Sequence, residues 1–321
     1  METQQSIHTL DAHLHFDPPA EIERICALIR GEVKRRGVRG VVIGLSGGLD
    51  STTCAYLCAR CLPAHQIHLI SLPERDSSAV MQNHAHAVAQ TLGLPLEEKN
   101  LSDLFAELGV YENMPFNITN NRPLLERSIQ ILRWLSGAPA LFPWSQGYAF
   151  DRRTGLLGAL LRRRLWRYAG LTETFIIGKV RARMLLLSLQ ATRRDCLLVC
   201  TTDRSEYSIG FYDPHGDGVG DIAPLRHLYK TQIRELARTL GVAEEILRQP
   251  SSGDLAAGLP NETAIGLRYE QLDRVLAGLS LGMSDEKIAR GVGVKRAAVR
   301  GIRSACQVAD ARRHMPMEVN Q

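Results

Sequence analysis

The stretch VVIGLSGGLDS, residues 41–51, restricts the fold of this chain more than any other part of it. Its first three residues are β-branched and apolar, which is typical of a buried strand. Gly44, Gly47 and Gly48 interrupt this strand, and residues 52–62 have the pattern of a helix. A strand, a glycine-rich turn and a helix in this order predict a turn whose backbone N–H groups are free at the start of the helix.

This turn has the chemistry of a polyphosphate-binding loop. An anion can approach its glycines closely because they lack a Cβ atom, and the helix dipole adds positive potential. Ser46 and Ser51 add hydroxyl donors, and Asp50 can hold a Mg²⁺ ion that binds the phosphates. The Walker pattern GxxxxGK[ST] is absent, and the order SGG-x-DS instead resembles the PP-loop of the ATP pyrophosphatases. A plain tight turn would need only two glycines, and it would leave Ser46, Asp50 and Ser51 unexplained.

The composition is that of an ordinary soluble protein. The chain has 321 residues, of which 45% are hydrophobic and 23% charged, enough for one large domain or two small ones. The formal net charge of +5 suits anionic substrates such as nucleotides. We find no secretory segment and no apolar run long enough to span a membrane, so we expect a cytoplasmic protein without a membrane partner.

The seven cysteines are expected to be reduced thiols, because their number is odd and the expected compartment is reducing. Cys54, Cys58 and Cys61 recur at the spacing of one helical stripe. Cys58 and Cys61 also have the C-x-x-C spacing of redox and zinc sites. No second pair lies at a suitable distance, so we favour packing in the core.

Strands and helices alternate through much of the chain. This pattern predicts a parallel sheet with helices on both faces, whose ligands bind at the carboxyl ends of the strands. The expected strands besides the first are residues 66–72, 95–100 and 196–202, and the expected helices include 20–36, 77–92, 178–190, 228–240 and 267–279.

The expected domain plan has three parts. Residues 1–19 are a loose polar N-terminal arm, residues 20–280 form the nucleotide-binding domain, and residues 281–321 are a helical tail. Two short helices in this tail superficially resemble a helix-turn-helix, a pattern common in any helical tail, so we reject DNA binding.

Residues 112–171 form an insertion within the central domain. It holds all three tryptophans, and six arginines fall within residues 151–168. Residues 156–168 are compatible with a basic amphipathic helix. A solvated arginine face is one interpretation. A lid over an anionic substrate, a partner contact and RNA binding are the others.

A glycine-rich acidic loop follows the strand at residues 196–202. Residues 210–225 contain four glycines and two prolines, which exclude regular structure. Asp213, Asp217 and Asp221 recur every four residues along this loop. Carboxylates beside a phosphate site suit a hard cation or the polar groups of a substrate.

Three segments together resemble the NAD synthetase family. They are SGGLDS; RARMLLLSL followed by TTDRSEYSIGFYDPHGDGVGDIAPL; and LYKTQIRELARTLGV with PSSGDL and NETAIGLRYEQLD behind it. The resemblance covers most of residues 21–279. It implies a flavodoxin- or Rossmann-like doubly wound α/β fold and usually a homodimer. It also implies that Mg-ATP adenylates the carboxylate of deamido-NAD with release of pyrophosphate, after which ammonia displaces AMP.

The same resemblance assigns roles to individual residues. Asp50 and Lys230 would be catalytic, and Asp50 and Glu206 would hold Mg²⁺. The substrate-binding residues would be Arg181 or Arg183, Asp217 and Asp221. The ATP-binding residues would be Gly44, Leu45, Ser46, Gly47, Gly48, Leu49, Asp50, Ser51, Thr201, Lys230 and Ser251.

Some positions depart from the family pattern, mainly on the dinucleotide side. Pro214 stands where the family commonly has a lysine before GDG, and His314-Met315 stands where its tail has His-Lys. Ile177 replaces an asparagine, and Asn261 replaces an aspartate. The insertion arginines would replace the missing cations, or the enzyme would activate a small carboxylic acid other than deamido-NAD.

Two further alternatives are a tRNA-modifying PP-loop enzyme and a nucleotide-binding regulator without catalysis. The first would be expected to show an RNA-binding domain or a catalytic cysteine pair, and neither is evident, so we expect no nucleic-acid partner. The set of Asp50, Glu206 and Lys230 argues against the second. Only 45 residues precede Ser46, too few for a glutaminase domain, so we expect free ammonia or ammonia from a separate glutaminase.

Overall fold

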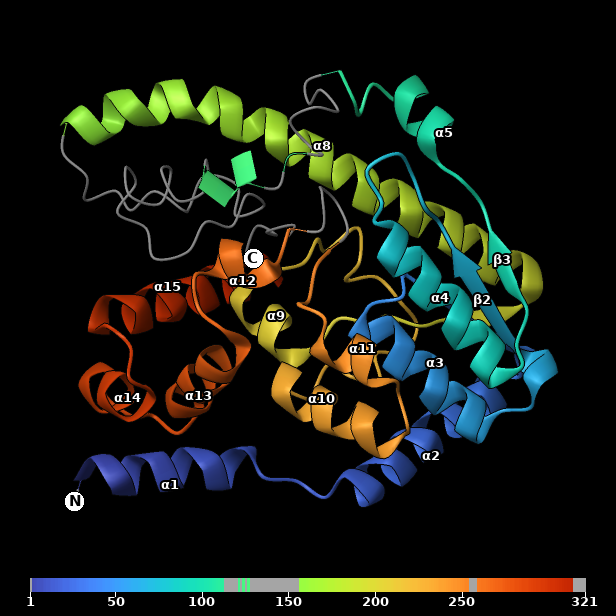
Figure 1. Ribbon diagram of the computed structural model, residues 1–321, viewed down its shortest axis with the longest axis horizontal. Coiled ribbons are helices and arrows are strands. Elements are labelled where there is room, and N and C mark those ends of the chain that lie inside the picture. Colours follow the sequence, from blue (N-terminus) through green and yellow to red (C-terminus); the bar gives the residue numbers. More distant parts are fainter. Residues whose placement is uncertain are drawn as a thin grey trace, which may run out of the picture.

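The computed structural model describes residues 2–112, 121, 123, 124, 126, 127, 156–253 and 259–313. Among them, four strands form one parallel sheet in the order β3-β2-β1-β4 (Figure 1). The expected strands are therefore confirmed. The first extends one residue beyond the apolar run at each end, and the other three are shorter than expected. The strands are β1 (Gly40–Gly44), β2 (Ile67–Ser71), β3 (Leu96–Glu98) and β4 (Cys196–Leu198).

Helices cover both faces of this sheet, as the sequence predicts. Along β1 the side chains alternate, so that Val41 and Ile43 join one core cluster and Val42 joins another. On the Val42 side the sheet packs against Leu187 and Ala191 of α8 (Leu156–Arg194). The helices on the other side are α2 (Pro18–Arg36), α3 (Leu49–Cys61), α4 (Ala79–Leu92), α10 (Lys230–Thr239) and α11 (Glu244–Arg248).

Helix α8 is a single element of 39 residues that runs along the molecule in Figure 1. It joins the two helices expected at residues 156–168 and 178–190. The last third of this helix crosses the sheet. Phe175, in the middle of the helix, and Ala182 pack against Phe105 of α5 (Ser102–Glu107). Most of the expected insertion before residue 156 lies outside the described residues.

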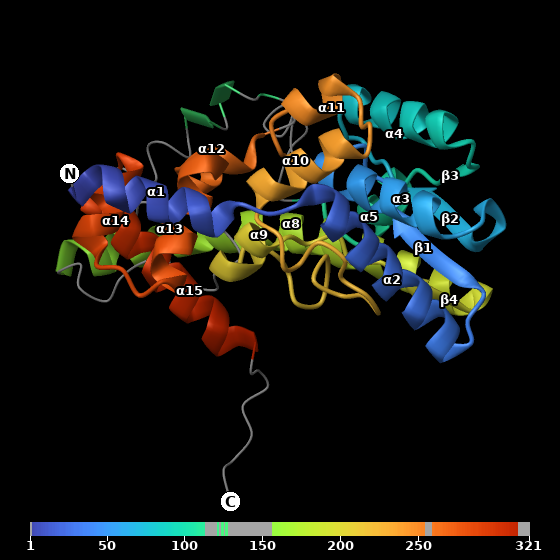
Figure 2. The same cartoon turned by 90° about the horizontal axis from the view of Figure 1, so that it is seen from below.

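A second core cluster holds the C-terminal helices together. These helices are α13 (Tyr269–Ser280), α14 (Asp285–Val292) and α15 (Arg296–Arg313). Figures 1 and 2 both show α1 lying along α13 and α14. The expectation of a loose N-terminal arm is wrong, because α1 (Glu2–Leu14) is a docked helix. Leu10 is fully buried in the contact, and Asp11 forms an ion pair with Arg274. The polar composition of this segment gives little sign that Leu10 becomes buried.

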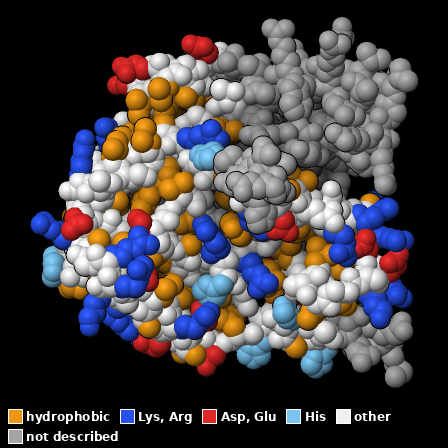
Figure 3. All heavy atoms as spheres, turned by 180° about the vertical axis from the view of Figure 1, so that it is seen from behind, with side chains coloured by type: hydrophobic (Ala, Val, Ile, Leu, Met, Phe, Trp, Pro, Cys, Tyr) orange, Lys and Arg blue, Asp and Glu red, His pale blue; other side chains and the backbone are white. Residues whose placement is uncertain are grey.

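Several smaller features agree with the sequence. All seven cysteines are free, and Cys54 and Cys58 are buried in the main core. No helix within the described ranges is long and apolar enough to cross a membrane. On the face seen in Figure 3, Lys and Arg side chains are scattered among hydrophobic ones rather than gathered in one patch.

Candidate active site

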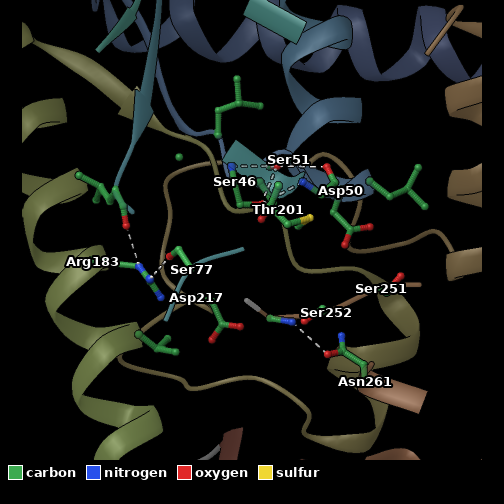
Figure 4. Close-up of a pocket in the computed structure, with 18 of the residues that line it drawn as sticks. Ser46, Asp50, Ser51, Ser77, Arg183, Thr201, Asp217, Ser251, Ser252 and Asn261 are labelled. Carbon is green, nitrogen blue, oxygen red and sulfur yellow. Dashed lines mark hydrogen bonds between the residues drawn. The ribbon is translucent and has the colours of Figure 1, made fainter. Parts of the chain in front are cut away.

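The site lies where the strand order changes direction. The chain proceeds from β1 outward to β2 and β3, and then returns to place β4 on the opposite side of β1. The loops after β1 and β4 therefore meet at the carboxyl edge of the sheet, the usual ligand position in such folds. They border a cavity of about 330 Å³, which also contacts α8, the acidic loop and α12 (Asn261–Ile265) (Figure 4).

The glycine-rich turn is held ready for an anion by its own side chains. The backbone N–H of Ser46 donates to Ser51 Oγ over 3.2 Å, and that hydroxyl donates to the carbonyl of Gly48 over 3.2 Å. Gly47 has φ +82°, and a Cβ atom there would lie 2.0 Å from the carbonyl oxygen of Met81. Only glycine fits this position. Helix α3 starts at Leu49, so its N-terminus faces the cavity.

Lys230 is the central charge of the site. It is the first residue of α10, and its side chain is fully buried. Its Nζ lies 2.7 Å from Asp50 Oδ2, 2.5 Å from Asp203 Oδ2 and 3.1 Å from Glu206 Oε1. Asp50 comes from α3, and the other two carboxylates come from Asp203 and Glu206 at the start of α9 (Arg204–Ile209). Three segments that are distant in the sequence thus meet around one ammonium group.

The cluster is strongly coupled electrostatically. Burial opposes the charge on Lys230, but Asp203, Asp50 and Glu206 outweigh it and raise the pKa of the lysine well above its usual value. Burial, followed by repulsion from Glu206, raises the pKa of Asp203 well above its usual value. Three carboxylates against one ammonium leave two negative charges uncompensated when all are ionised. This balance matches a divalent cation.

The residues present fit a Mg²⁺ ion. One carboxylate oxygen from each of Asp50, Asp203 and Glu206 lies within 4.8 Å of the others. Asp50 Oδ1 is buried and has no hydrogen-bond partner among the described residues, so one hard oxygen is left for a ligand. Asp203 is missing from the residues expected from the sequence. Its position directly after the strand expected at residues 196–202 is the signal that would have pointed to it.

A second layer fixes Lys230 and Glu206. The buried carboxylate of Asp273 accepts from Ser205 Oγ at 2.5 Å and from the backbone N–H of Thr231 at 2.9 Å, which fastens α9 to the start of α10. Ser205 Oγ in turn accepts from the N–H of Lys230. Tyr269 donates to Glu206 Oε1 over 2.6 Å, so the orientation of this carboxylate is set by α13.

Asn261 occupies the position at which the sequence departs from the family aspartate. Its Nδ2 donates to Glu206 Oε1 over 3.0 Å. An amide can donate this hydrogen bond, whereas an ionised carboxylate at the same position would have no proton to donate. Asn261 lines the cavity beside Ser252 and Ser251, as Figure 4 shows.

Most of the residues expected at the site do border the cavity, but four do not. Gly47 and Lys230 lie behind its lining, next to it. Arg181 forms an ion pair with Asp213, which itself lines the cavity, and Asp221 forms an ion pair with Arg36. The lining includes Gly44, Leu45, Ser46, Gly48, Leu49, Asp50, Ser51, Arg183, Thr201, Glu206, Asp217 and Ser251.

Asp217 brings the acidic loop to the cavity. Its backbone carbonyl accepts from Thr202 Oγ1 over 2.8 Å, and its carboxylate accepts from the N–H of Asp213 over 2.7 Å. Burial, with smaller contributions from Glu206 and Asp213, raises the pKa of Asp217 to about 7. The loop therefore presents a carboxyl group that changes charge near neutral pH.

Comparison with known proteins places this site in a family. Residues 21–120 and 177–316 match the family described as NAD synthase. An NH3-dependent NAD(+) synthetase of Thermotoga neapolitana is 34% identical over 284 residues, which cover 85% of this chain and 90% of the relative.

Two solved structures share the fold. The NMN synthetase of Francisella tularensis has a TM-score of 0.66 and 20% identity, covering 96% of this chain and 100% of that chain. An NH3-dependent NAD synthetase from Campylobacter jejuni, in complex with nitrate, has a TM-score of 0.63 and 21% identity, covering 95% and 100%. The family match spans most of the chain, so the protein belongs to the NAD synthase family.

Proposed function

We propose that this protein is an ammonia-dependent ligase that converts deamido-NAD to NAD with ATP. The carboxylate of deamido-NAD attacks the α-phosphorus of ATP, and pyrophosphate leaves. Ammonia then attacks the carbonyl of the acyl-adenylate, and AMP leaves. The observation that carries this proposal is the convergence of Lys230, Asp50 and Glu206 beside a phosphate-binding loop, on a chain of the NAD synthase family.

The reaction needs positioning and charge stabilisation rather than a nucleophile from the protein, because the substrate carboxylate attacks. The loop at residues 44–51 would bind the ATP phosphates through its N–H groups, and Thr201 and Ser251 border the same cavity. The buried hydroxyl of Ser251 has no hydrogen-bond partner among the described residues, so it is a donor for bound ATP.

Asp50 and Glu206 would hold Mg²⁺, with Asp203 as a third carboxylate. The ion would neutralise charge on the phosphates. Lys230 would stabilise the negative charge that gathers on the α-phosphate in the transition state. Because three carboxylates hold the ammonium group of Lys230 in place, this group needs to move little when negative charge develops on the phosphate.

The acid and ammonia would meet on the side of the cavity that holds Asp217. Free ammonium must lose a proton before its nitrogen can attack a carbonyl. A carboxyl with a pKa near 7 can accept that proton at neutral pH. We therefore assign Asp217 to the substrate side, as expected from the sequence.

We further propose that the protein is a homodimer that uses α8. Leu185 and Leu189 lie one turn apart on this helix and are 61% and 42% exposed, whereas Leu187 and Ala191 face the sheet. Large exposed apolar side chains in one stripe are typical of an interaction surface.

The test is an assay with ATP, Mg²⁺ and ammonium, with and without deamido-NAD, in which NAD and AMP are measured by mass spectrometry. Equal amounts of NAD and AMP are expected only when deamido-NAD is present. Binding of ATP without formation of NAD would contradict the assignment of the acid. A screen of other small carboxylic acids would then follow.

A further inference from the structure

A buried cluster of charged side chains lies next to the cavity, and the reaction proposed above does not use it. Lys179 of α8 contacts Glu74 Oε1 at 2.8 Å and Asp76 Oδ2 at 2.6 Å, and all three side chains are fully buried. Removing such ions from water is costly, and their mutual attraction offsets the cost only where the geometry is good and further hydrogen bonds are made. Stability alone is therefore a poor reason for the cluster.

The cluster reaches the cavity through Arg183. This residue follows Lys179 by one helical turn, on the same face of α8. Its Nη2 lies 3.7 Å from Glu74 Oε1 and donates to Ser77 Oγ over 3.4 Å. Its Nε donates to the carbonyl of Leu72, just after β2, over 3.1 Å. Arg183 and Ser77 line the cavity side by side, as Figure 4 shows.

Glu74 is itself held from several directions. Its Oε2 accepts from the hydroxyl of Tyr111 over 2.7 Å and from the N–H of Asp76 over 3.2 Å. Tyr111 precedes the stretch at residues 112–171, and Lys179 follows it. Tyr111 and Lys179, which flank that stretch in the sequence, thus both contact Glu74, and the same carboxylate lies 3.7 Å from Arg183.

One member of this cluster reaches the wall of the cavity. Arg75 also joins the cluster, with its Nε 3.5 Å from Asp76 Oδ2. Of the five charged groups, only Arg183 belongs to the cavity lining. Arg183 is therefore the member of the cluster that a ligand in the cavity would meet.

The position of Arg183 indicates which ligand it meets. It is bonded to the end of β2, the strand that pairs with β1, and β1 leads into the phosphate loop. Between these two points the cavity is lined by apolar side chains of Ile70, Met184 and Leu187. A nucleotide with its phosphates on the loop would extend across the end of β2, with its base against this apolar wall. Arg183 then flanks the nucleoside, where a guanidinium can stack on a base or donate to a ribose.

We propose that Glu74 is a positioning residue that holds Arg183 against the nucleoside half of bound ATP. The sequence resemblance assigned Arg183 to the dinucleotide instead, so the two assignments predict different kinetic effects. The identity of the nucleotide rests on the proposed function. The role of Glu74 does not require NAD to be the product.

The test is a double-mutant cycle with Glu74→Gln, Arg183→Ala and the variant that carries both. Glu74→Gln is expected to raise the KM for ATP about tenfold, and kcat and the KM for deamido-NAD should change less than about twofold. Arg183→Ala should raise the KM for ATP at least as much. Adding Glu74→Gln to Arg183→Ala should give no further rise, because the first change acts through the second.

Glu97→Gln is the matched control. This change breaks an exposed ion pair with Arg194, also on α8, and leaves the cavity lining intact. Its KM for ATP should stay at the wild-type value. If Glu74→Gln fails to fold, Tyr111→Phe removes only the hydroxyl bond to Glu74 and is expected to raise the KM for ATP about twofold to threefold.

Three results would overturn the inference. They are a KM for ATP in Glu74→Gln equal to that in Glu97→Gln, independent effects that multiply in the double variant, and a rise confined to deamido-NAD. Calorimetric titration with ATP alone separates this inference from the proposed function. If the wild type makes no NAD, the proposed function fails, whereas the titration still reports whether Glu74 affects ATP binding.

Discussion

Lys230 illustrates how single residues acquire their roles here. The sequence pattern predicts only that Lys230 lies near the start of an amphipathic helix. The resemblance to the family predicts that it binds a phosphate of ATP. The structure adds that it is buried among three carboxylates. Asp50 and Glu206 could be predicted as its neighbours from the resemblance. The contact between Asp203 and Lys230 could not be predicted, because a contact between residues distant in the sequence produces no periodic pattern.

The buried carboxyl of Asp273 gives a second prediction about a single residue, because its titration can be measured. Burial raises its pKa to about 6, against about 3.8 for an exposed carboxyl. The folded state therefore holds this proton more tightly than the unfolded state, and the contribution of Asp273 to stability is lost as the pH rises through about 6. Asp273→Asn removes this titration. We expect the destabilisation caused by Asp273→Asn to be about 1 kcal/mol larger at pH 5 than at pH 7.5.

Urea unfolding of both proteins at the two pH values provides the measurement. Equal destabilisation at pH 5 and pH 7.5 would show that the carboxyl of Asp273 does not titrate as described.

At the scale of elements, the β1–turn–α3 unit was predictable and several helices were not. Val41, Val42 and Ile43 alternate between two cores, and the glycines after them stop the strand. Periodicity and turn chemistry carry that information locally. The short helices α9, α11 and α12 escaped prediction, because one or two turns give no clear period. The docking of α1 was not predicted either, because the helices that it contacts, α13 and α14, come from the other end of the chain.

Gly47 provides the test of the turn. With φ +82° and the carbonyl of Met81 2.0 Å from any Cβ, Gly47→Ala must displace the turn or α4. We expect a loss of ATP affinity of at least tenfold, measured by calorimetric titration, and a lower melting temperature. Gly93→Ala is the control, because Gly93 also has positive φ but has open space around its Cβ position. Gly93→Ala should lower the melting temperature while the affinity for ATP stays unchanged. Normal ATP affinity in Gly47→Ala would contradict the geometry of the turn.

At the scale of the whole molecule, the doubly wound architecture followed from the alternation of strands and helices. The sequence did not predict that the two helices expected at residues 156–168 and 178–190 form one helix, α8. The residues before 178 gave no sign that the helix is continuous. This long helix provides one wall of the cavity and an exposed apolar stripe on its other side. One element thus links the catalytic pocket with the proposed dimer surface.

The dimer proposal predicts the behaviour of one variant. Leu185→Asp places a charge in the exposed stripe and should convert a dimer into a monomer in sedimentation velocity, with the melting temperature of the isolated chain little affected. Leu28→Asp, at a side chain that is 46% exposed on α2, is the control and should remain dimeric. A monomeric wild type, or a dimeric Leu185→Asp variant, would contradict the use of α8.

The central claim is that Asp50 and Lys230 form a site where a carboxylate is adenylated. It is tested most directly by exchange of labelled pyrophosphate into ATP, with Mg²⁺ and deamido-NAD present and ammonia absent. Adenylation is reversible before ammonia arrives, so the wild type should incorporate label only when deamido-NAD is present. Asp50→Ala should lose this exchange while keeping its fold. Two results would contradict the account. They are incorporation of label that does not depend on deamido-NAD, and an unchanged rate of incorporation in Asp50→Ala.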